Sequence, residues 1–438
     1  MSQQPKIIVL DDDPTGSQTV HSCLLLMKWD IDTLRDGLRD ESPIFFILTN
    51  TRALTPTEAR EVTQDVCRNL KTAIELEGIQ EYLVVSRSDS TLRGHYPLET
   101  DVIAEELGEF DAHFLIPAFF EGGRITRDSI HYLLVNGVET PVHETEFAQD
   151  SVFGYKYSYL PDYVEEKTKG RITADKVERF LLVDIRNGTQ NRLRELKHNQ
   201  CVVVDAENQQ DLDKLAHDLL QIAQEGKKFL FRSAASILTS LASLGKQPIP
   251  AENMAKYKPT SNSGVIIVGS HVKKTTQQLT QLLQQPEIVG IEIDVTILRD
   301  NWLDRDQVIK SALDKVTQAL NNAKTPVVYT SRQELSFPDI HTRLEFGKQV
   351  SGVLMDIVKG LPSDIGFLIS KGGITSNDVL SDGLALKEAR LLGQILAGCS
   401  VIITPENHHL FPNLPVVLFP GNVGDENGLV TAYQRMKN

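Results

Sequence analysis

Residues 6–16 read KIIVLDDDPTG, and this stretch sets the pattern for the whole chain. The run KIIVL (6–10) is apolar and rich in β-branched residues, which is typical of a strand buried on both faces of a sheet. Three aspartates and a Pro-Thr-Gly turn follow it directly. In α/β proteins, ligands bind where loops leave the carboxyl ends of such strands. The stretch therefore predicts both a buried strand and a site at its end.

Similar apolar runs recur along the chain and alternate with amphipathic segments. In residues 55–78, apolar side chains recur at intervals of three and four, which predicts a helix that ends at Gly78. Buried strands separated by helices predict an α/β fold, in which each domain is a mostly parallel sheet flanked by helices. The other predicted strands are PIFFILT (43–49), EYLVVS (81–86), HFLIPA (113–118), RFLLVD (179–184), CVVVDA (201–206), KFLFRS (228–233), GVIIVGS (264–270), GIEIDVTIL (290–298), PVVYTS (326–331), GFLISKGG (366–373) and LPVVLF (414–419).

The 438-residue length is enough for two or three domains. Residues 243–263 contain three prolines and several small polar residues without periodicity, which is typical of a linker. We therefore expect one α/β domain over residues 1–245, a linker over 246–262 and a second α/β domain over 263–438. The region 119–175 is less regular, and we expect a long functional excursion there.

The charge of the chain excludes some classes of partner. It carries 45 Lys and Arg against 59 Asp and Glu, a formal net charge of −14. A field of this sign repels phosphate backbones and anionic lipids, so we expect neither a nucleic-acid nor a membrane partner. The four cysteines lie far apart and the N-terminus lacks a signal-peptide pattern. We expect a cytoplasmic protein with reduced thiols.

The acidic turn after the first strand is a candidate catalytic site. Carboxylates at a strand end can bind a divalent cation, accept a hydroxyl proton or hydrogen-bond a polyol. We assign Asp12 and Asp13 as candidate catalytic residues, one of which would orient a substrate hydroxyl and accept its proton. The alternative is a solvated acidic turn in which an aspartate caps a helix.

Arginines after neighbouring strands form a candidate anion pocket, because the planar guanidinium fork matches a carboxylate or a phosphate. TNTR (49–52) ends the second predicted strand and SRSDSTLRGH (86–95) ends the third. The alternative is a set of separate surface arginines. PAFFEGGRITRD (117–128) adds two more arginines and is open to two interpretations, a flexible lid or a surface loop. The predicted substrate-binding residues are Arg52, Arg87, Ser88, Asp89, Ser90, Thr91 and Arg93.

Three glycine-containing turns follow predicted strands in the second half: VGSHVKKTT (268–276), SKGGITSNDV (370–379) and PGNVGDENG (420–428). Such turns offer backbone N–H groups to a phosphate, although none is a Walker A loop. Together they predict a nucleotide site, and ordinary strand-to-helix connections are the alternative. The predicted nucleotide-binding residues are Ser270, Gly372, Gly373, Ile374, Thr375, Ser376, Gly421 and Asn422.

Taken together, these motifs resemble those of the four-carbon acid sugar kinase family, which includes D-threonate, D-erythronate and 3-oxo-tetronate kinases. The resemblance covers essentially the whole chain, and SDSTLRG (88–94) is its most specific match, to the family pattern D-S-T-L-R-G. The other matches are to D-D-x-T-G (Asp12, Asp13, Thr15, Gly16), to G-S with T-x-x-Q (Gly269, Ser270, Thr275, Gln278) and to G-G-x-T (Gly372, Gly373, Thr375).

The chain departs from the family pattern at three places, one of which is an insertion around residues 140–175 that has no counterpart in the pattern. Arg87 replaces the usual lysine, and Phe419 and Pro420 stand where the family pattern K-S-G-N-F-G has lysine and serine. One positive charge near the phosphates is therefore missing, unless Lys371 or Lys273 supplies it.

The resemblance implies an ATP-dependent kinase that uses Mg²⁺ and phosphorylates a terminal hydroxyl of a small, four-carbon acid sugar. It implies that the first domain holds the sugar acid and the second holds ATP. A homodimer is left open, as are the choice of sugar acid and the Mg²⁺ ligands. The alternatives are a sugar-acid or nucleotide sensor without turnover and a nicotinamide-dependent dehydrogenase, which the lack of a G-x-G-x-x-G motif disfavours.

Overall fold

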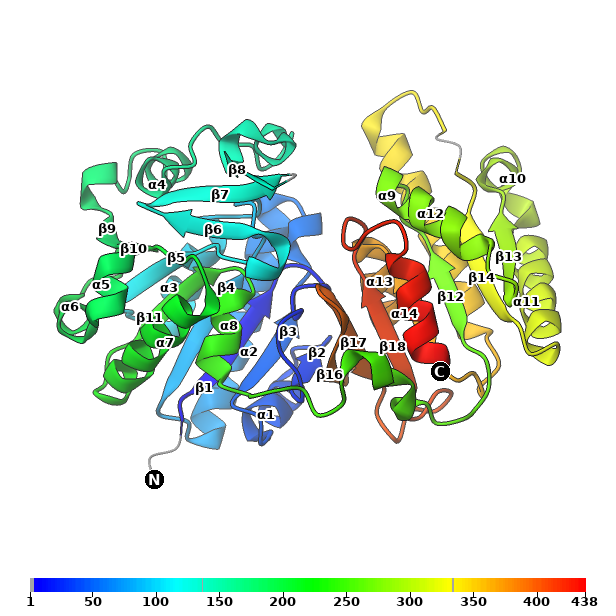
Figure 1. The fold of residues 1–438 in the computed structure, drawn as a ribbon, viewed down its shortest axis with the longest axis horizontal. Coiled ribbons are helices and arrows are strands. Elements are labelled where there is room, and N and C mark those ends of the chain that lie inside the picture. Colours follow the sequence, from blue (N-terminus) through cyan, green and yellow to red (C-terminus); the bar gives the residue numbers. More distant parts are fainter. Residues whose placement is uncertain (1–3, 136, 333–334) are drawn as a thin grey trace. The chain divides into compact units, whose positions relative to one another are not determined.

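The computed structural model describes residues 4–135, 137–332 and 335–438. The chain divides into two compact units, Met1–Lys246 and Gln247–Asn438, each described here by itself. Each unit is built on a mostly parallel sheet with helices against it, so the predicted α/β class is confirmed (Figure 1).

The sheet of the first unit has the strand order β2-β3-β1-β4-β11-β5-β10-β9, and all neighbouring strands in it are parallel. Because the strands are parallel, their carboxyl ends lie at one edge of the sheet. Their bounds are β1 (Lys6–Asp11), β2 (Leu24–Leu26), β3 (Ile44–Leu48), β4 (Tyr82–Arg87), β5 (Ala112–Ile116), β9 (Glu178–Phe180), β10 (Gln200–Val204) and β11 (Phe229–Ser233).

Helices of the first unit form two groups, one of α1–α3 and the other of α5, α6 and α8 around α7. Alternate strand residues such as Ile8 and Leu10 pack with apolar side chains of α1–α3 in one buried cluster. Helix α2 begins with a capping box between Thr55 and Glu58 and ends at Gly78, as predicted. The bounds are α1 (Ile31–Arg39), α2 (Pro56–Glu77), α3 (Leu98–Leu107), α5 (Leu182–Asn187), α6 (Gln190–Glu195), α7 (Gln209–Gln224) and α8 (Ser236–Ala242).

The excursion predicted over residues 119–175 contains a small antiparallel sheet, β6-β7-β8, in Figure 1. Tyr155 and Tyr163, which follow this sheet, are buried in one apolar cluster with Leu92 from the loop after β4. The excursion therefore packs against the strand-end loops of the main sheet. Its elements are η2 (Phe120–Gly122), β6 (Arg124–Arg127), β7 (Ile130–Val135), β8 (Val138–Pro141), η3 (Val142–Glu144), η4 (Glu146–Gln149), α4 (Leu160–Lys167) and η5 (Ala174–Lys176).

The sheet of the second unit has the strand order β13-β14-β12-β15-β18-β17-β16. Neighbours from β13 to β18 are parallel, whereas β17 runs antiparallel to both β18 and β16. The strands are β12 (Val265–Val268), β13 (Ile288–Ile293), β14 (Thr325–Thr330), β15 (Leu368–Lys371), β16 (Glu388–Leu396), β17 (Cys399–Ile403) and β18 (Pro415–Phe419).

The core of the second unit joins its strands to α9 and α14, and it includes Met254 from the segment between the predicted domains. Met254 lies in η6 (Ala251–Tyr257), so part of residues 246–262 is structured and packed. The domain bounds assigned from the sequence stay a prediction. The helices are α9 (Lys273–Leu283), α10 (Val295–Asp300), α11 (Arg305–Asn321), α12 (Ile340–Lys359), α13 (Gly373–Asp378), η8 (Val379–Gly383) and α14 (Gly428–Lys437).

Two predicted strands are wrong over part of their length. RFLLVD (179–184) stops being a strand at Phe180, because the Asp184 carboxylate accepts the Leu181 N–H and caps α5. GIEIDVTIL (290–298) becomes a helix after Ile293, where the Asp294 carboxylate caps α10. In both cases a short polar side chain inside an apolar run starts a helix. Within the part of the chain that the structure describes, no helix is long and apolar enough to cross a membrane.

Candidate active site

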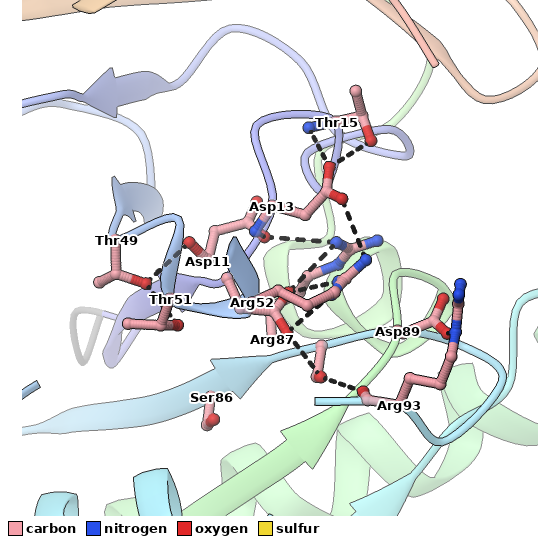
Figure 2. Close-up of polar contacts among 12 residues, drawn as sticks. Asp11, Asp13, Thr15, Thr49, Thr51, Arg52, Ser86, Arg87, Asp89 and Arg93 are labelled. Carbon is pink, nitrogen blue, oxygen red and sulfur yellow. Dashed lines mark hydrogen bonds and ion pairs between the residues drawn. The ribbon is translucent and has the colours of Figure 1, made fainter. Parts of the chain in front are cut away.

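The acidic turn, Arg52 and Arg87 meet at one edge of the first sheet, as Figure 2 shows. Strand β1 pairs with β3 on one side and β4 on the other, and the register sets Asp11 opposite Leu48 and Arg87. The turn after β1, η1 (Thr51–Ala53) after β3 and the end of β4 are therefore neighbours. The structure thus brings these three segments together, as the sequence analysis predicted.

Arg52 binds both predicted catalytic aspartates. Its Nε and Nη2 donate to the two oxygens of Asp12 at 3.1 and 2.5 Å, and its Nη1 donates to Asp13 Oδ2 at 3.0 Å. The Asp12 side chain is 2% exposed and that of Asp13 is 22% exposed, so only Asp13 is within reach of a ligand. Burial alone would raise the pKa of Asp13, but the charges of Arg52 and Arg87 and hydrogen bonds from Thr15 hold it below its usual value.

Asp11, which was not among the predicted site residues, lies under the turn beside Arg87. Arg87 Nη1 donates to Asp11 Oδ1 at 3.3 Å, and both side chains are buried. Asp11 Oδ2 and Arg87 Nε are buried without a hydrogen-bond partner. Burial raises the pKa of Asp11 to about 7, although Arg87 opposes the rise. Arg87 is therefore a buried support of the acidic turn.

A second buried arginine, Arg232 at the end of β11, joins the cluster and was missed by the sequence analysis. Its Nη1 donates to Glu99 Oε2 at 2.5 Å and to Ser86 Oγ at 2.8 Å, and its Nη2 donates to Ser88 Oγ at 2.6 Å. Ser88 in turn donates to Asp12 Oδ2 at 2.8 Å. KFLFRS (228–233) reads as a buried strand, and only its parallel pairing with β4 brings Arg232 to this edge.

The loop after β4 forms its own local network. Arg93 Nε donates to Asp89 Oδ2 at 2.7 Å, Thr91 donates to the same oxygen, and Arg93 Nη1 lies 3.6 Å from Asp150 Oδ2. Gly94 has φ +121°, and a Cβ there would lie 2.5 Å from Ser88 Oγ, so the turn requires glycine.

A cavity behind this loop, lined by Ser88, Asp89 and Arg93 among others, has a volume of about 10 Å³. It has room for about one water molecule. A ligand larger than a water molecule has access to the cluster only from its open side, where Asp13 and Arg93 are partly exposed. A larger open hollow of about 470 Å³ lies between α11 and α12 and is lined by partly exposed and exposed side chains, among them Arg305, Lys310 and Asp356.

Side chains of the excursion fix the backbone of the loop after β4. His131 Nε2 lies 2.8 Å from the Ser90 carbonyl oxygen. The Tyr155 hydroxyl donates to the Thr91 carbonyl at 2.7 Å, and the Tyr163 hydroxyl donates to the Leu92 carbonyl at 2.8 Å. These three contacts hold the backbone of the loop, in addition to the ion pairs among its own side chains. Ser90, one of the predicted substrate-binding residues, has a buried side chain in this loop.

In the second unit the three glycine-containing turns lie side by side, because β12, β15 and β18 are adjacent. The Ser270 N–H donates to the Lys371 carbonyl at 3.3 Å, and the Gly372 N–H donates to the Phe419 carbonyl at 2.8 Å. Gly372 has φ +122°, and a Cβ there would lie 2.8 Å from Ser270 Cβ. The turns are therefore in close backbone contact, in a form that suits phosphate binding.

The other predicted nucleotide-binding residues differ in exposure. Thr375 and Ser376 are buried, and Ser376 Oγ lies 2.8 Å from Ser370 Oγ, whereas Ile374 is 71% exposed. Asn422 is exposed and Gly373 and Gly421 are half-buried. The exposed members can contact a ligand directly, and the buried ones hold the turns.

Lys371, at the end of β15, connects the turn after β15 with the turn after β18. Its Nζ donates to the carbonyl oxygens of Pro420 at 2.5 Å and Gly421 at 3.1 Å, and it lies 4.3 Å from the centre of the Phe419 ring. The side chain is fully buried, and burial lowers the pKa of Lys371 to about 7. Of the two lysines considered for the missing charge, Lys371 is the one beside Phe419, whereas Lys273 is exposed at the start of α9.

Two more residues of the second unit belong to this region. Gln278, on α9, donates through Nε2 to the carbonyl oxygens of Val423 at 2.9 Å and Asp425 at 2.7 Å, and so holds the third turn. Arg332 follows β14 and donates to Thr276 Oγ1, while its Nη1 is buried without a partner. The sequence analysis missed Arg332 because the run PVVYTS ends without a glycine motif.

The described residues contain no cluster of acidic, His or Cys side chains that would hold the predicted Mg²⁺ by itself. Among residues 4–135, 137–332 and 335–438, no three His, Cys, Asp or Glu side chains are grouped so that they could hold a metal ion. Asp12 and Asp13 instead direct oxygens at Arg52. The side chains therefore do not fit a metal site of their own.

Two family models match the chain. The model described as a sugar-binding N-terminal domain matches residues 7–241, and the one described as a nucleotide-binding C-terminal domain matches residues 265–429. The two matches fall within the first and second compact units in turn.

Curated relatives match the chain in sequence, and solved structures match it in fold. A D-erythronate kinase from Heliobacterium modesticaldum is 24% identical over 403 residues, which cover 84% of this chain and 83% of the relative. A D-threonate kinase from Bordetella bronchiseptica is 27% identical over 165 residues, 36% of this chain and 38% of that one. A structure from Salmonella typhimurium LT2 (TM-score 0.70, 19% identity, 98% of each chain) and one from Haemophilus influenzae (TM-score 0.65, 20% identity, 98% and 100%) share the fold.

Proposed function

The chain belongs to the four-carbon acid sugar kinase family, and on that basis we propose that it transfers the γ-phosphoryl group of ATP to a terminal hydroxyl of a four-carbon acid sugar. The observation that carries this proposal is the partly exposed Asp13 held by Arg52 at a strand end, in the unit that matches a sugar-binding model. The names of the two kinase relatives, which act on D-erythronate and D-threonate, supply the substrate class.

On the acceptor side, Asp13 orients the attacking hydroxyl and accepts its proton as the oxygen bonds to the γ-phosphorus and the bond to ADP breaks. Its low pKa keeps it ionised, so it can accept that hydrogen bond at neutral pH. Asp12, which is buried against Arg52 and Ser88, positions Asp13 through Arg52 rather than touching substrate. The proposal thus gives Asp12 and Asp13 different roles, whereas the sequence analysis gave both the same candidate role.

On the nucleotide side, the turns at Ser270, Gly372–Gly373 and Gly421–Asn422 present backbone N–H groups to the phosphates. Phosphoryl transfer depends mainly on positioning and charge neutralisation, so preorganised turns of this kind supply much of the stabilisation. Helix α9 adds a second donor set, because its N-cap residue, Val272, makes no side-chain cap hydrogen bond. Mg²⁺ would accompany the ATP phosphates, and no step of this proposal depends on a protein ligand for it.

The proposal is tested by measuring ADP release with ATP, Mg²⁺ and a panel of four- and five-carbon aldonates that includes D-erythronate and D-threonate. We expect release that depends on a four-carbon acid, and a phosphorylated product by mass spectrometry. Binding of both ligands without ADP release would instead indicate a sensor. If ADP is released with another acceptor but with none of the four-carbon acids, the proposed substrate class is contradicted.

A further inference from the structure

The three arginines predicted to bind the substrate carboxylate, and Arg232 beside them, already have carboxylate partners within the chain. Each lies within 4 Å of at least one aspartate or glutamate, so its charge is compensated before any ligand arrives. The pairs are Arg52 with Asp12 and Asp13, Arg87 with Asp11 and Asp12, Arg93 with Asp89 and Asp150, and Arg232 with Glu99. A substrate carboxylate placed on them would face the carboxylates that they hold.

Arg124, the first residue of β6, differs from all of them. In the part of the chain that the structure describes, no carboxylate lies within ion-pair distance of its guanidinium. Its Nη1 donates to the Gly122 carbonyl, and its Nε is buried without a hydrogen-bond partner. Burial lowers the pKa of Arg124, as expected for a cation without a close counter-ion.

The local backbone holds Arg124 in place. Backbone hydrogen bonds of 2.9 and 3.0 Å join Arg124 and Phe119 in both directions, and the guanidinium carbon lies 6.0 Å from the centre of the Phe119 ring. These contacts limit the freedom of the side chain. An anion that binds it therefore has less side-chain entropy to overcome.

The same strand is connected to the loop after β4. Two residues beyond Arg124, Thr126 Oγ1 lies 2.9 Å from His131 Nδ1, and His131 Nε2 lies 2.8 Å from the Ser90 carbonyl. The charges of Asp89 and Arg93 both act on the Arg124 guanidinium. Arg124 thus lies by the loop that carries the most specific family motif.

We propose that Arg124 binds the carboxylate of the acid substrate and so selects acids over the corresponding polyols. The assignment rests on the proposed function and names the group that reads the acid. The guanidinium has further N–H donors besides the Nη1 that binds Gly122, and a carboxylate bound to two of them would form a charge-assisted contact that supplies the missing counter-ion. Arg52 and Arg87 then hold the acidic turn through their ion pairs, and Arg93 pairs with Asp89 and Asp150.

The test compares Arg124→Met and Arg124→Lys with a matched control, Arg127→Met. Arg127 lies on the same strand but pairs with Glu139 and Glu207 at the surface. Binding of D-erythronate, D-threonate, erythritol and ATP is measured by calorimetry, with the KM and kcat of each acceptor. We expect Arg124→Met to weaken acid binding about 10- to 100-fold, with ATP and erythritol binding unchanged. Arg124→Lys should recover part of the loss, and Arg127→Met should match the wild type.

Each other result counts against the assignment. Unchanged acid binding in Arg124→Met, with a wild type that phosphorylates D-erythronate, overturns the role of Arg124 and leaves the proposed function standing. Equal losses for acid and erythritol show a structural role and overturn it as well. A wild type that neither binds nor phosphorylates either acid overturns the proposed function, and the assignment fails with it.

Discussion

Asp12 and Asp13 are adjacent in sequence but differ in what they can do. Both bind Arg52, yet Asp12 is almost fully buried and Asp13 is partly exposed. We therefore expect Asp13→Asn to lower kcat about 10²–10⁴-fold, the usual contribution of a general base, with little change in the Kd of ATP. Steady-state kinetics and nucleotide titration measure the two effects.

Asp32→Asn is the matched control, because Asp32 is an exposed aspartate on α1. We expect it to keep wild-type kinetics. Asp12→Asn should lower both kcat and thermal stability, since it removes the buried negative charge that pairs with Arg52. If Asp13→Asn turned over at the wild-type rate with its fold intact, the acidic turn would have no part in proton transfer.

Lys371 should make stability depend on pH. Its pKa is about 7 in the folded chain and 10.5 is the ordinary value, so between about pH 7 and pH 10 the unfolded state binds the extra proton. The free energy of unfolding should therefore rise with pH in this window, relative to Lys371→Met, by at most about 1.4 kcal/mol per pH unit. Urea unfolding of both proteins at a series of pH values measures the difference.

Lys273→Met serves as the comparison, because Lys273 is exposed at the start of α9. The difference in the free energy of unfolding between wild type and Lys273→Met should not change with pH over the same range. If the difference in the free energy of unfolding between wild type and Lys371→Met is also independent of pH, Lys371 remains charged in the folded chain.

At the scale of elements, the sequence predicts the strand ends well because each buried parallel strand is a continuous apolar run that stops at a polar turn. Pairing of β1 with β3 and β4 then brings Asp12, Arg52 and Arg87 together. Arg124 and Arg232 could not be placed in this way, since their positions depend on the pairing of β6 with β7 and of β11 with β4. The helix starts at Leu182 and Val295 were missed because one carboxylate in each run overrides its apolar pattern.

The turn after β15 gives an element-scale prediction. Gly372 has φ +122° and no room for a Cβ against Ser270, so Gly372→Val should displace the turn from its neighbours. We expect ATP binding to weaken at least about tenfold with sugar-acid binding unchanged. Gly347→Ala is the control, since a Cβ at that α12 position meets nothing within 4 Å. Equal ATP affinity in Gly372→Val and the wild type would exclude a close backbone approach to the phosphates at this turn.

At the scale of the whole molecule, each compact unit has an apolar core of its own. The first contains the cluster of strand residues with α1–α3, and the second contains the cluster around α9 and α14. The candidate residues divide in the same way, with the Asp-Arg cluster in the first unit and the three glycine-containing turns in the second. This division fits the proposal that each unit binds one of the two substrates, although the chain as a whole carries −14, a charge that repels anions.

Separate expression of residues 1–246 and 247–438 tests this division. Because each unit has its own core, we expect each fragment to fold with the circular dichroism of an α/β protein. Calorimetry should show ATP binding to the second fragment within about tenfold of the full chain, and D-erythronate binding to the first alone. Neither fragment should release ADP, since the acceptor hydroxyl and the γ-phosphate would then be held by different molecules. ATP binding by residues 1–246 at full-chain affinity would contradict the division, because the three adjacent turns would not be the nucleotide site.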